Sequence, residues 1–171
     1  MLFRSPVTEI TITPGATIGI FSAIQAIVHP GDEVIIFDPS YDSYSPSVQL
    51  VGAKAIHIAL NAPEFSVDWN QVKDAISAKT RMIIVNTPHN PTGAIWSKQD
   101  WLNLIELIED KNIIVLSDEV YEHLIFDRHK HYSALSFPEL RHRSFVVGSF
   151  GKTFHVTGWK TGYCVAAPEL M

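Results

Sequence analysis

The sequence is poor in several features that would place it in one of the large classes of proteins. It has a single cysteine, Cys164, which excludes an internal disulfide and leads us to expect a reducing, cytoplasmic location. No apolar run is long enough to cross a bilayer, and the opening "MLFRSPVTEI" has no apolar core of signal-peptide length. The formal net charge of −5 disfavours nucleic acid or an anionic membrane as a partner.

Charged residues are also scarce, at 18%, whereas 46% of the 171 residues are hydrophobic. This balance excludes a disordered chain and predicts one domain with a substantial core. The one locally basic stretch, residues 128–143, is expected to be a solvated loop rather than a binding patch. The spacing of His123, His129 and His131 matches no tight ligand pattern, so we predict no metal site.

Short β-rich runs alternate with helical patterns along the chain. Most of the runs are continuously apolar, which is typical of a sheet covered on both faces, so the predicted fold is a three-layer α/β/α arrangement around a mostly parallel seven-stranded sheet. Strands are predicted over residues 8–13, 33–37, 53–60, 81–86, 112–117, 144–150 and 162–167, and helices over 16–28, 68–77 and 98–110, the last with Ser97 as its N-cap.

Both ends of the sequence indicate a domain cut from a longer protein. Pro168, Glu169 and Leu170 resemble the first turn of a helix, with proline in its favoured early position. The first predicted strand begins almost at the start of the chain. We therefore expect residues 1–171 to form one truncated domain, with an N-terminal segment and a C-terminal domain absent.

In open α/β sheets, ligands bind beyond the carboxyl ends of the strands, so the residues after each predicted strand are the candidates for a site. After the first strand, residues 14–17 (Pro-Gly-Ala-Thr) open a helix, where free N–H groups suit an anion such as phosphate; a plain tight turn is the alternative. After the second strand, Tyr41 and Tyr44 are expected at the same rim, where a ring can stack on a flat ligand or merely pack the loop.

The later strands add polar and charged groups to this rim. Asn90 lies in the proline-rich turn "NTPHNPTG", which offers a rigid amide donor, and Asp118 ends its strand three residues before Tyr121. The last candidate segment, "SFGKTFHVTGWKTGY", contains two lysines in glycine-rich turns, each able to act as a phosphate charge or a nucleophilic amine.

One ligand uses all of these groups together. The turn "TPGATIG" lacks the G-x-G-x-x-G pattern of a dinucleotide site, and no Walker A loop is present. Pyridoxal phosphate is a phosphorylated aromatic aldehyde with a ring nitrogen. A lysine amine forms its Schiff base, and a carboxylate keeps the ring nitrogen protonated so that the ring acts as an electron sink.

The order and spacing of "TPGAT", "DPSYDSY", "NTPHNPTG", "SDEVYEHL" and "SFGKTFHVTGWKTGY" resemble the class I/II aminotransferases of fold type I. The resemblance covers essentially the whole chain, and it is greatest to the branch of kynurenine, glutamine and methionine aminotransferases and cysteine-conjugate β-lyases. It implies a homodimer that transfers an amino group between an amino acid and a 2-oxo acid.

The resemblance also implies a role for each candidate. Lys152 would hold the cofactor as the internal aldimine and move the proton, with Asp118 on the ring nitrogen. Asn90 and Tyr121 would bind the phenolic oxygen, and Tyr41 would stack on the ring. The phosphate would be held by Gly15, Ala16, Thr17, Ser149 and Lys160. On this basis the catalytic residues are Lys152, Asp118 and Tyr121.

Several features depart from the family or leave its chemistry open. Lys160 stands where arginine is the commoner phosphate ligand, although lysine is frequent in the named branch, and His155 replaces a usually small or aliphatic residue. No residue can be assigned to grip the substrate carboxylate, which in the family is the work of an arginine in the small domain. Transamination, β-elimination from cysteine conjugates, and cofactor binding without turnover all remain open.

Overall fold

The computed structural model describes residues 5–171, so the first four residues of the stretch considered for a leader lie outside it. Seven strands form one sheet in the order β1-β7-β6-β5-β4-β2-β3. Strands β2 to β6 run parallel, whereas β7 is antiparallel to both β6 and β1. The strands are β1 (Ile10–Thr13), β2 (Glu33–Asp38), β3 (Lys54–Ala59), β4 (Thr80–Asn86), β5 (Ile114–Asp118), β6 (Ser144–Ser149) and β7 (Gly162–Val165). The predicted fold class and all seven predicted strands are confirmed.

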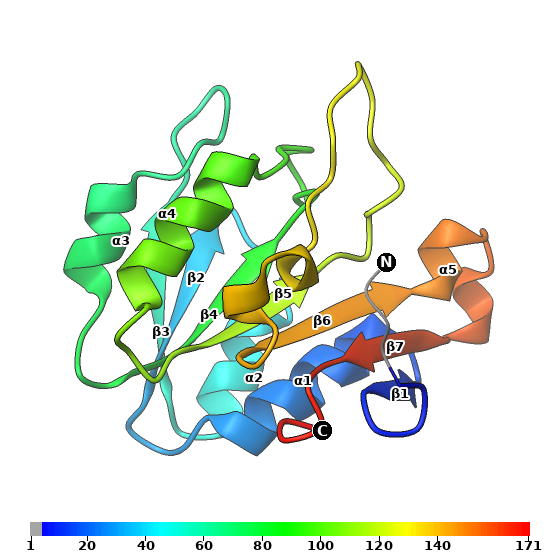
Figure 1. The fold of residues 1–171 in the computed structure, drawn as a ribbon, viewed down its shortest axis with the longest axis horizontal. Helices are drawn as coiled ribbons and strands as arrows, with labels where there is room; N and C mark the ends of the chain where they lie inside the picture. Colours follow the sequence, from blue (N-terminus) through cyan, green and yellow to red (C-terminus); the bar gives the residue numbers. More distant parts are fainter. Residues whose placement is uncertain (1–4) are drawn as a thin grey trace.

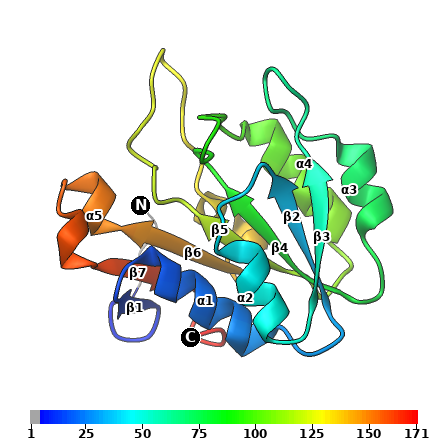
Figure 2. The ribbon, with the colours of Figure 1, turned by 180° about the vertical axis from the view of Figure 1, so that it is seen from behind.

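Helices cover both faces of the sheet. Figure 1 shows α3 (Trp69–Ala75) and α4 (Lys98–Ile108) in front of the strands, and Figure 2 shows α1 (Ala16–Ile27) and α2 (Tyr44–Leu50) on the opposite face. Short helical segments complete the fold: α5 (Phe150–Thr153) and the 3-10 turns η1 (Ala134–Ser136), η2 (Pro138–Leu140) and η3 (Thr157–Trp159). This is the expected three-layer arrangement.

The apolar strands fill two cores because successive side chains point to opposite faces of the sheet. In β2, Val34 and Ile36 pack with α1 and α2, whereas Ile35 and Phe37 pack with α3 and α4. Strands β4, β5 and β6 divide their side chains in the same way. The continuously apolar pattern therefore marks strands with no solvent face, as predicted.

Local signals fix the ends of the helices. Ser97 caps α4 as predicted: its hydroxyl accepts the N–H of Asp100 at 3.2 Å, and the Asp100 carboxylate accepts the N–H of Ser97 at 2.8 Å. At the other end of α4, the Arg143 guanidinium donates to the carbonyl of Ile108 at 2.7 Å. The helix thus has a reciprocal cap at its start and a cation at its negative end.

The expectation for residues 128–143 is wrong for the second half of this stretch. Ala134 on η1, Leu140 on η2 and Phe137 between the two turns are buried against α4 and β6. Their spacing of three places them on one side of successive 3-10 turns. Because charged residues dominate the composition of this stretch, the apolar spacing is difficult to detect in the sequence. Near the C-terminus, Pro168 to Leu170 make one turn, in which the Met171 N–H donates to the Ala167 carbonyl at 3.2 Å.

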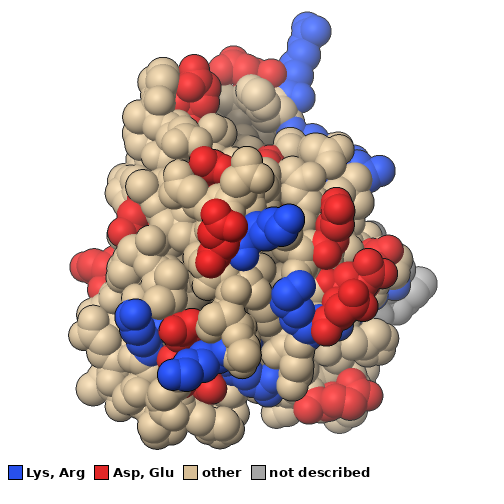
Figure 3. Space-filling model, turned by 90° about the vertical axis from the view of Figure 1, so that its left-hand side faces the viewer, with Lys and Arg blue, Asp and Glu red and all other residues tan. Residues whose placement is uncertain are grey.

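Charges of both signs are distributed over the surface. On the face drawn in Figure 3, basic and acidic side chains are interspersed, without a field of one sign. Within residues 5–171, no helix has the length and apolar character needed to cross a membrane.

Candidate cofactor site

A cavity of about 610 Å³ opens at the carboxyl ends of the parallel strands. Parallel strands place the residues that follow them at one edge of the sheet, which is why segments far apart in sequence meet here. All ten candidates line this cavity: Gly15, Ala16, Thr17, Tyr41, Asn90, Asp118, Tyr121, Ser149, Lys152 and Lys160. The structure therefore brings the predicted set together at one site.

The N-terminus of α1 forms one end of the cavity. Gly15 precedes the helix with φ 83°, a conformation that favours glycine, and no side chain among residues 5–171 caps the 12-residue helix. Its first N–H groups are therefore available to an anion. Gly162 of β7 lies against this turn so closely that a Cβ there would be 2.6 Å from the Ala16 nitrogen. The Thr17 hydroxyl lies 3.3 Å from the Tyr41 hydroxyl.

Two lysines face the same cavity. Lys152 lies on α5, directly after β6, and Lys160 follows η3 in a left-handed conformation with φ 53°. Lys160 lies beside the start of α1, since a Cβ on Gly15 would be 3.8 Å from the Lys160 carbonyl oxygen. Neither ammonium makes a hydrogen bond or an ion pair within residues 5–171. Both are thus available to a ligand. His155 is exposed, with φ 56°, and does not line the cavity.

Asp118 lies deep in the cavity, at the end of the central strand β5, with 5% of its surface exposed. The pKa of this carboxyl is raised from its ordinary 3.8 to about 6, chiefly by burial and to a smaller extent by the neighbouring Glu119. Hydrogen bonds from Tyr44 and from the Val120 N–H act in the opposite direction. The Asp118 carboxylate thus has two hydrogen-bond donors and no cationic partner among residues 5–171. Such a buried carboxylate is suited to bind a positively charged group of a ligand.

Sequence reasoning misplaced Tyr44, which is not at the rim. Its side chain is 2% exposed, and its hydroxyl donates to Asp118 Oδ2 at 2.6 Å. The rings of Tyr41 and Tyr44 meet edge to face at 5.6 Å, so Tyr41 alone of the two lines the cavity. The two tyrosines separate because α2 begins at Tyr44 and turns that ring into the core.

Asn86, at the end of β4, is a cavity residue that sequence reasoning missed. Its amide donates to the Asp118 carbonyl at 3.0 Å, and its side-chain oxygen accepts the Asn90 N–H at 2.7 Å. One side chain therefore fixes the loop of Asn90 against the strand of Asp118. The signal was available, because Asn86 directly ends a parallel strand and opens the motif "NTPHNPTG".

His89 holds the same loop from its other side. Its Nδ1 lies 2.7 Å from the Thr92 hydroxyl, and the ring also hydrogen-bonds the Pro39 carbonyl. Burial lowers the pKa of His89, which favours the neutral ring. The loop of Asn90 and the loop of Tyr41 are thereby joined.

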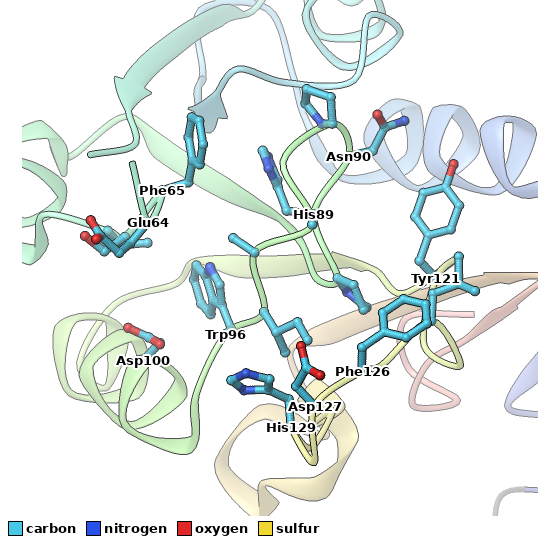
Figure 4. Close-up of a pocket in the computed structure, with 18 residues that line it drawn as sticks. Glu64, Phe65, His89, Asn90, Trp96, Asp100, Tyr121, Phe126, Asp127 and His129 are labelled. Carbon is cyan, nitrogen blue, oxygen red and sulfur yellow. The ribbon is translucent and has the colours of Figure 1, made fainter. Parts of the chain in front are cut away.

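A second cavity, of about 760 Å³, adjoins the first and is drawn in Figure 4. Asn90 and Tyr121 line both cavities; Figure 4 shows Phe126 beside Tyr121, with Phe65 and Trp96 on the opposite side. No lysine or arginine lines this second cavity among the described residues. Of the two cavities, the first is the one lined by Lys152, Lys160 and the N-terminus of α1.

The loop after β5 is held by Glu119. Its buried carboxylate accepts the Ser117 hydroxyl at 2.8 Å, the Ala134 N–H at 2.9 Å and a contact from His131 Nε2 at 3.0 Å. Glu119, Glu122 and His131 offer ligand atoms within 4.8 Å of one another. Since these bonds already engage Glu119, its visible role is to anchor the loop that carries Tyr121.

The fold and the site define a class of protein, and comparison with known proteins identifies the family. Residues 2–171 match the family described as aminotransferase class I and II, so the chain belongs to this family. The resemblance carried by the sequence motifs is thereby confirmed.

The relatives include two enzymes of the branch named above. The chain is 50% identical over 159 residues to the methionine aminotransferase of Escherichia coli K12, covering 93% of this chain and 41% of that protein. It is 37% identical over 170 residues to a probable kynurenine–oxoglutarate transaminase of Saccharomyces cerevisiae, covering 92% and 38%. A solved Escherichia coli structure with a methionine aminotransferase function superposes with a TM-score of 0.96 at 48% identity, covering 98% of this chain and 44% of that one. The chain thus spans about two fifths of these relatives.

Proposed function

We propose that this chain is the cofactor-binding part of a pyridoxal-phosphate-dependent aminotransferase, which transfers an amino group between an amino acid and a 2-oxo acid. The observation that carries the proposal is one cavity with an uncapped helix N-terminus and two free lysines, and with a buried carboxylate at its floor. When bound, the cofactor supplies an aldehyde for the amine and a ring that accepts electrons.

The donor set fits this cofactor. The phosphate would lie at the N-terminus of α1, within reach of Thr17, Ser149 and Lys160, because N–H groups and cations meet there. The ring would stack on Tyr41, and Asn90 and Tyr121 would donate to its phenolic oxygen. Asp118 would meet the ring nitrogen, where a positive charge offsets the burial of its carboxylate.

Lys152 is the proposed catalytic residue. Its free amine is a nucleophile that lines the cavity, and of the two cavity lysines Lys152 is the nearer in sequence to the end of β6. It would bind the cofactor covalently and then move a proton on and off the Cα of the substrate. Tyr121 would orient the phenolic oxygen beside it. The cavity contains no arginine among the described residues, so the grip on the substrate carboxylate would come from elsewhere in the assembled enzyme.

The assembled enzyme is proposed to be a homodimer in the cytoplasm, on the basis of the family and of the single free thiol of Cys164. Amino acids and 2-oxo acids are the proposed substrates, as the names of the relatives suggest.

The test is borohydride reduction of the full-length protein with pyridoxal phosphate, followed by peptide mapping. We expect a stable pyridoxyl adduct on Lys152, formation of a 2-oxo acid from an amino donor, and loss of both in Lys152→Ala. Lys54→Ala removes an exposed lysine on β3 and is the matched control. An adduct that persists in Lys152→Ala would refute the assignment. Release of pyruvate and a thiol from cysteine conjugates, without amino transfer, would favour the β-lyase alternative.

A further inference from the structure

The hydrogen bond from Tyr44 to Asp118 has a functional consequence that rests on the proposed cofactor. We propose that Tyr44 is a positioning residue: its hydroxyl fixes the orientation and the charge of the Asp118 carboxylate, and so keeps the shared proton on the ring nitrogen of the cofactor. Tyr44 lies behind Asp118 and does not line the cofactor cavity. Its hydroxyl can act on the cofactor through the carboxylate, whereas its ring packs against Tyr41, a contact that Tyr44→Phe preserves.

The direction of this hydrogen bond is fixed by the groups that form it. An ionised carboxylate can only accept, so the phenol donates. Burial and the charge of Asp118 raise the pKa of Tyr44 well above its ordinary value, which keeps the hydroxyl protonated. The distance of 2.6 Å is in the range of charge-assisted O–H···O bonds.

The bond dominates the surroundings of the carboxylate. Asp118 has only one other donor among residues 5–171, the Val120 N–H at 3.2 Å to Oδ1. The titratable or charged groups near it are Tyr44 from α2, Glu119 beside it in sequence, and Tyr121 on the following loop. Loss of the phenol would leave a buried carboxylate with one long hydrogen bond, beside the charge of Glu119.

A buried carboxylate that loses its strongest donor becomes more basic. Opposite a ring nitrogen, a more basic carboxylate draws the proton from the nitrogen toward itself. The ring then withdraws electrons less strongly in the step in which Lys152 takes the Cα proton. Tyr44 would thus affect the rate of proton transfer more than the binding of substrate or cofactor.

The rigid setting of Tyr44 supports this role over a purely structural one. The ring belongs to the core between α1, α2 and the sheet, with 2% of its surface exposed. Packing explains the ring but not the hydroxyl, since a phenylalanine would fill nearly the same volume. Among the described residues, the hydroxyl hydrogen-bonds Asp118 alone, so its effect can be tested separately by Tyr44→Phe.

The experiment uses the full-length protein loaded with pyridoxal phosphate labelled with ¹⁵N in the ring. In Tyr44→Phe we expect the ring-nitrogen resonance to move toward the unprotonated value, kcat to fall by about tenfold, and KM to change little. The matched control is Tyr163→Phe, which removes another phenol that donates to a carboxylate, Glu122, at 2.8 Å, outside the cavity. The control should retain the ring-nitrogen resonance of the parent.

A double-mutant cycle separates this role from packing. If Tyr44 acts through Asp118, then Tyr44→Phe should change kcat less than twofold in an Asp118→Asn background. A full tenfold loss in that background, or a parent-like ring-nitrogen resonance in Tyr44→Phe, would overturn the proposal. A parent protein that forms no adduct with pyridoxal phosphate would instead refute the proposed function.

A measurement without substitution covers the case in which Tyr44→Phe does not fold. The hydroxyl proton of Tyr44 in the parent should resonate at low field because its hydrogen bond is short. It should shift when pyridoxal phosphate is replaced by an analogue with carbon in place of the ring nitrogen. Identical hydroxyl resonances with the two cofactors would contradict the coupling.

Discussion

The buried carboxylate of Asp118 should make the stability of the cofactor-free protein depend on pH in a defined way. Its pKa is about 6 in the folded protein against an ordinary value of 3.8, so the folded state binds the proton more tightly than the unfolded state does. The contribution of the protonated Asp118 carboxyl to the free energy of unfolding is complete below pH 3.8 and is lost as the pH rises through about 6. The two pKa values differ by an amount that corresponds to about 3 kcal/mol.

Asp118→Asn removes this ionisation while preserving the shape of the side chain and an oxygen that accepts from Tyr44. We expect the unfolding free energy of the variant, relative to the parent, to rise by up to about 3 kcal/mol between pH 4 and pH 8. Urea unfolding of both full-length proteins without cofactor, across this range, measures the difference, in which the other titrating groups largely cancel. A difference that does not change with pH would refute the burial argument.

We expect bound cofactor to make the parent more stable than Asp118→Asn. With pyridoxal phosphate bound, a protonated ring nitrogen beside Asp118 would stabilise the carboxylate, and the parent should exceed the variant in stability and in rate. A variant that remains more stable than the parent with the cofactor present would show that Asp118 and the ring nitrogen do not interact.

Two further predictions concern the frame of the site. Gly162→Ala should abolish cofactor binding, because its Cβ would be 2.6 Å from the Ala16 nitrogen; Gly158→Ala, where a Cβ meets nothing within 4 Å, is the control, and absorbance titration with pyridoxal phosphate compares them. Equal affinity in the two variants would contradict the close approach. Ser97→Ala should lower the unfolding free energy by about 1 kcal/mol through loss of the cap of α4, as measured by urea unfolding, and an unchanged midpoint would contradict the capping geometry.

The fold could be predicted well where one physical rule dominates. Inner strands such as β4 and β5 contain continuous apolar runs, Met82 to Val85 and Ile114 to Leu116, because both faces are covered, and the sequence pattern is unambiguous there. The helix α2 was missed because its first turn contains Pro46 and two serines, which are typical of a loop; α3 has the same length of seven residues and was predicted. The buried turns η1 and η2 were missed because charged neighbours dominate their composition.

The positions of the site residues could be predicted from the topology of the sheet. Residues that follow parallel strands must meet at one edge, so Asn90, Asp118 and Lys152 could be placed together without coordinates. What could not be predicted is the layer behind them. Whether Tyr44 lies at the rim or beneath Asp118 depends on the residue at which α2 begins, and that is decided by packing in three dimensions.

The pairing of β1 with β7 has a consequence for the timing of folding. The turn at Gly15, at the proposed phosphate end of the cavity, is synthesised well before β7, yet β1 pairs with β7 at Gly162–Val165. At about 5–20 residues per second, the first strand would wait roughly 8–30 s for its partner. A growing chain would therefore lack a place for the phosphate until the last strand emerges, and capture of the cofactor would mark the closing of the sheet rather than its beginning.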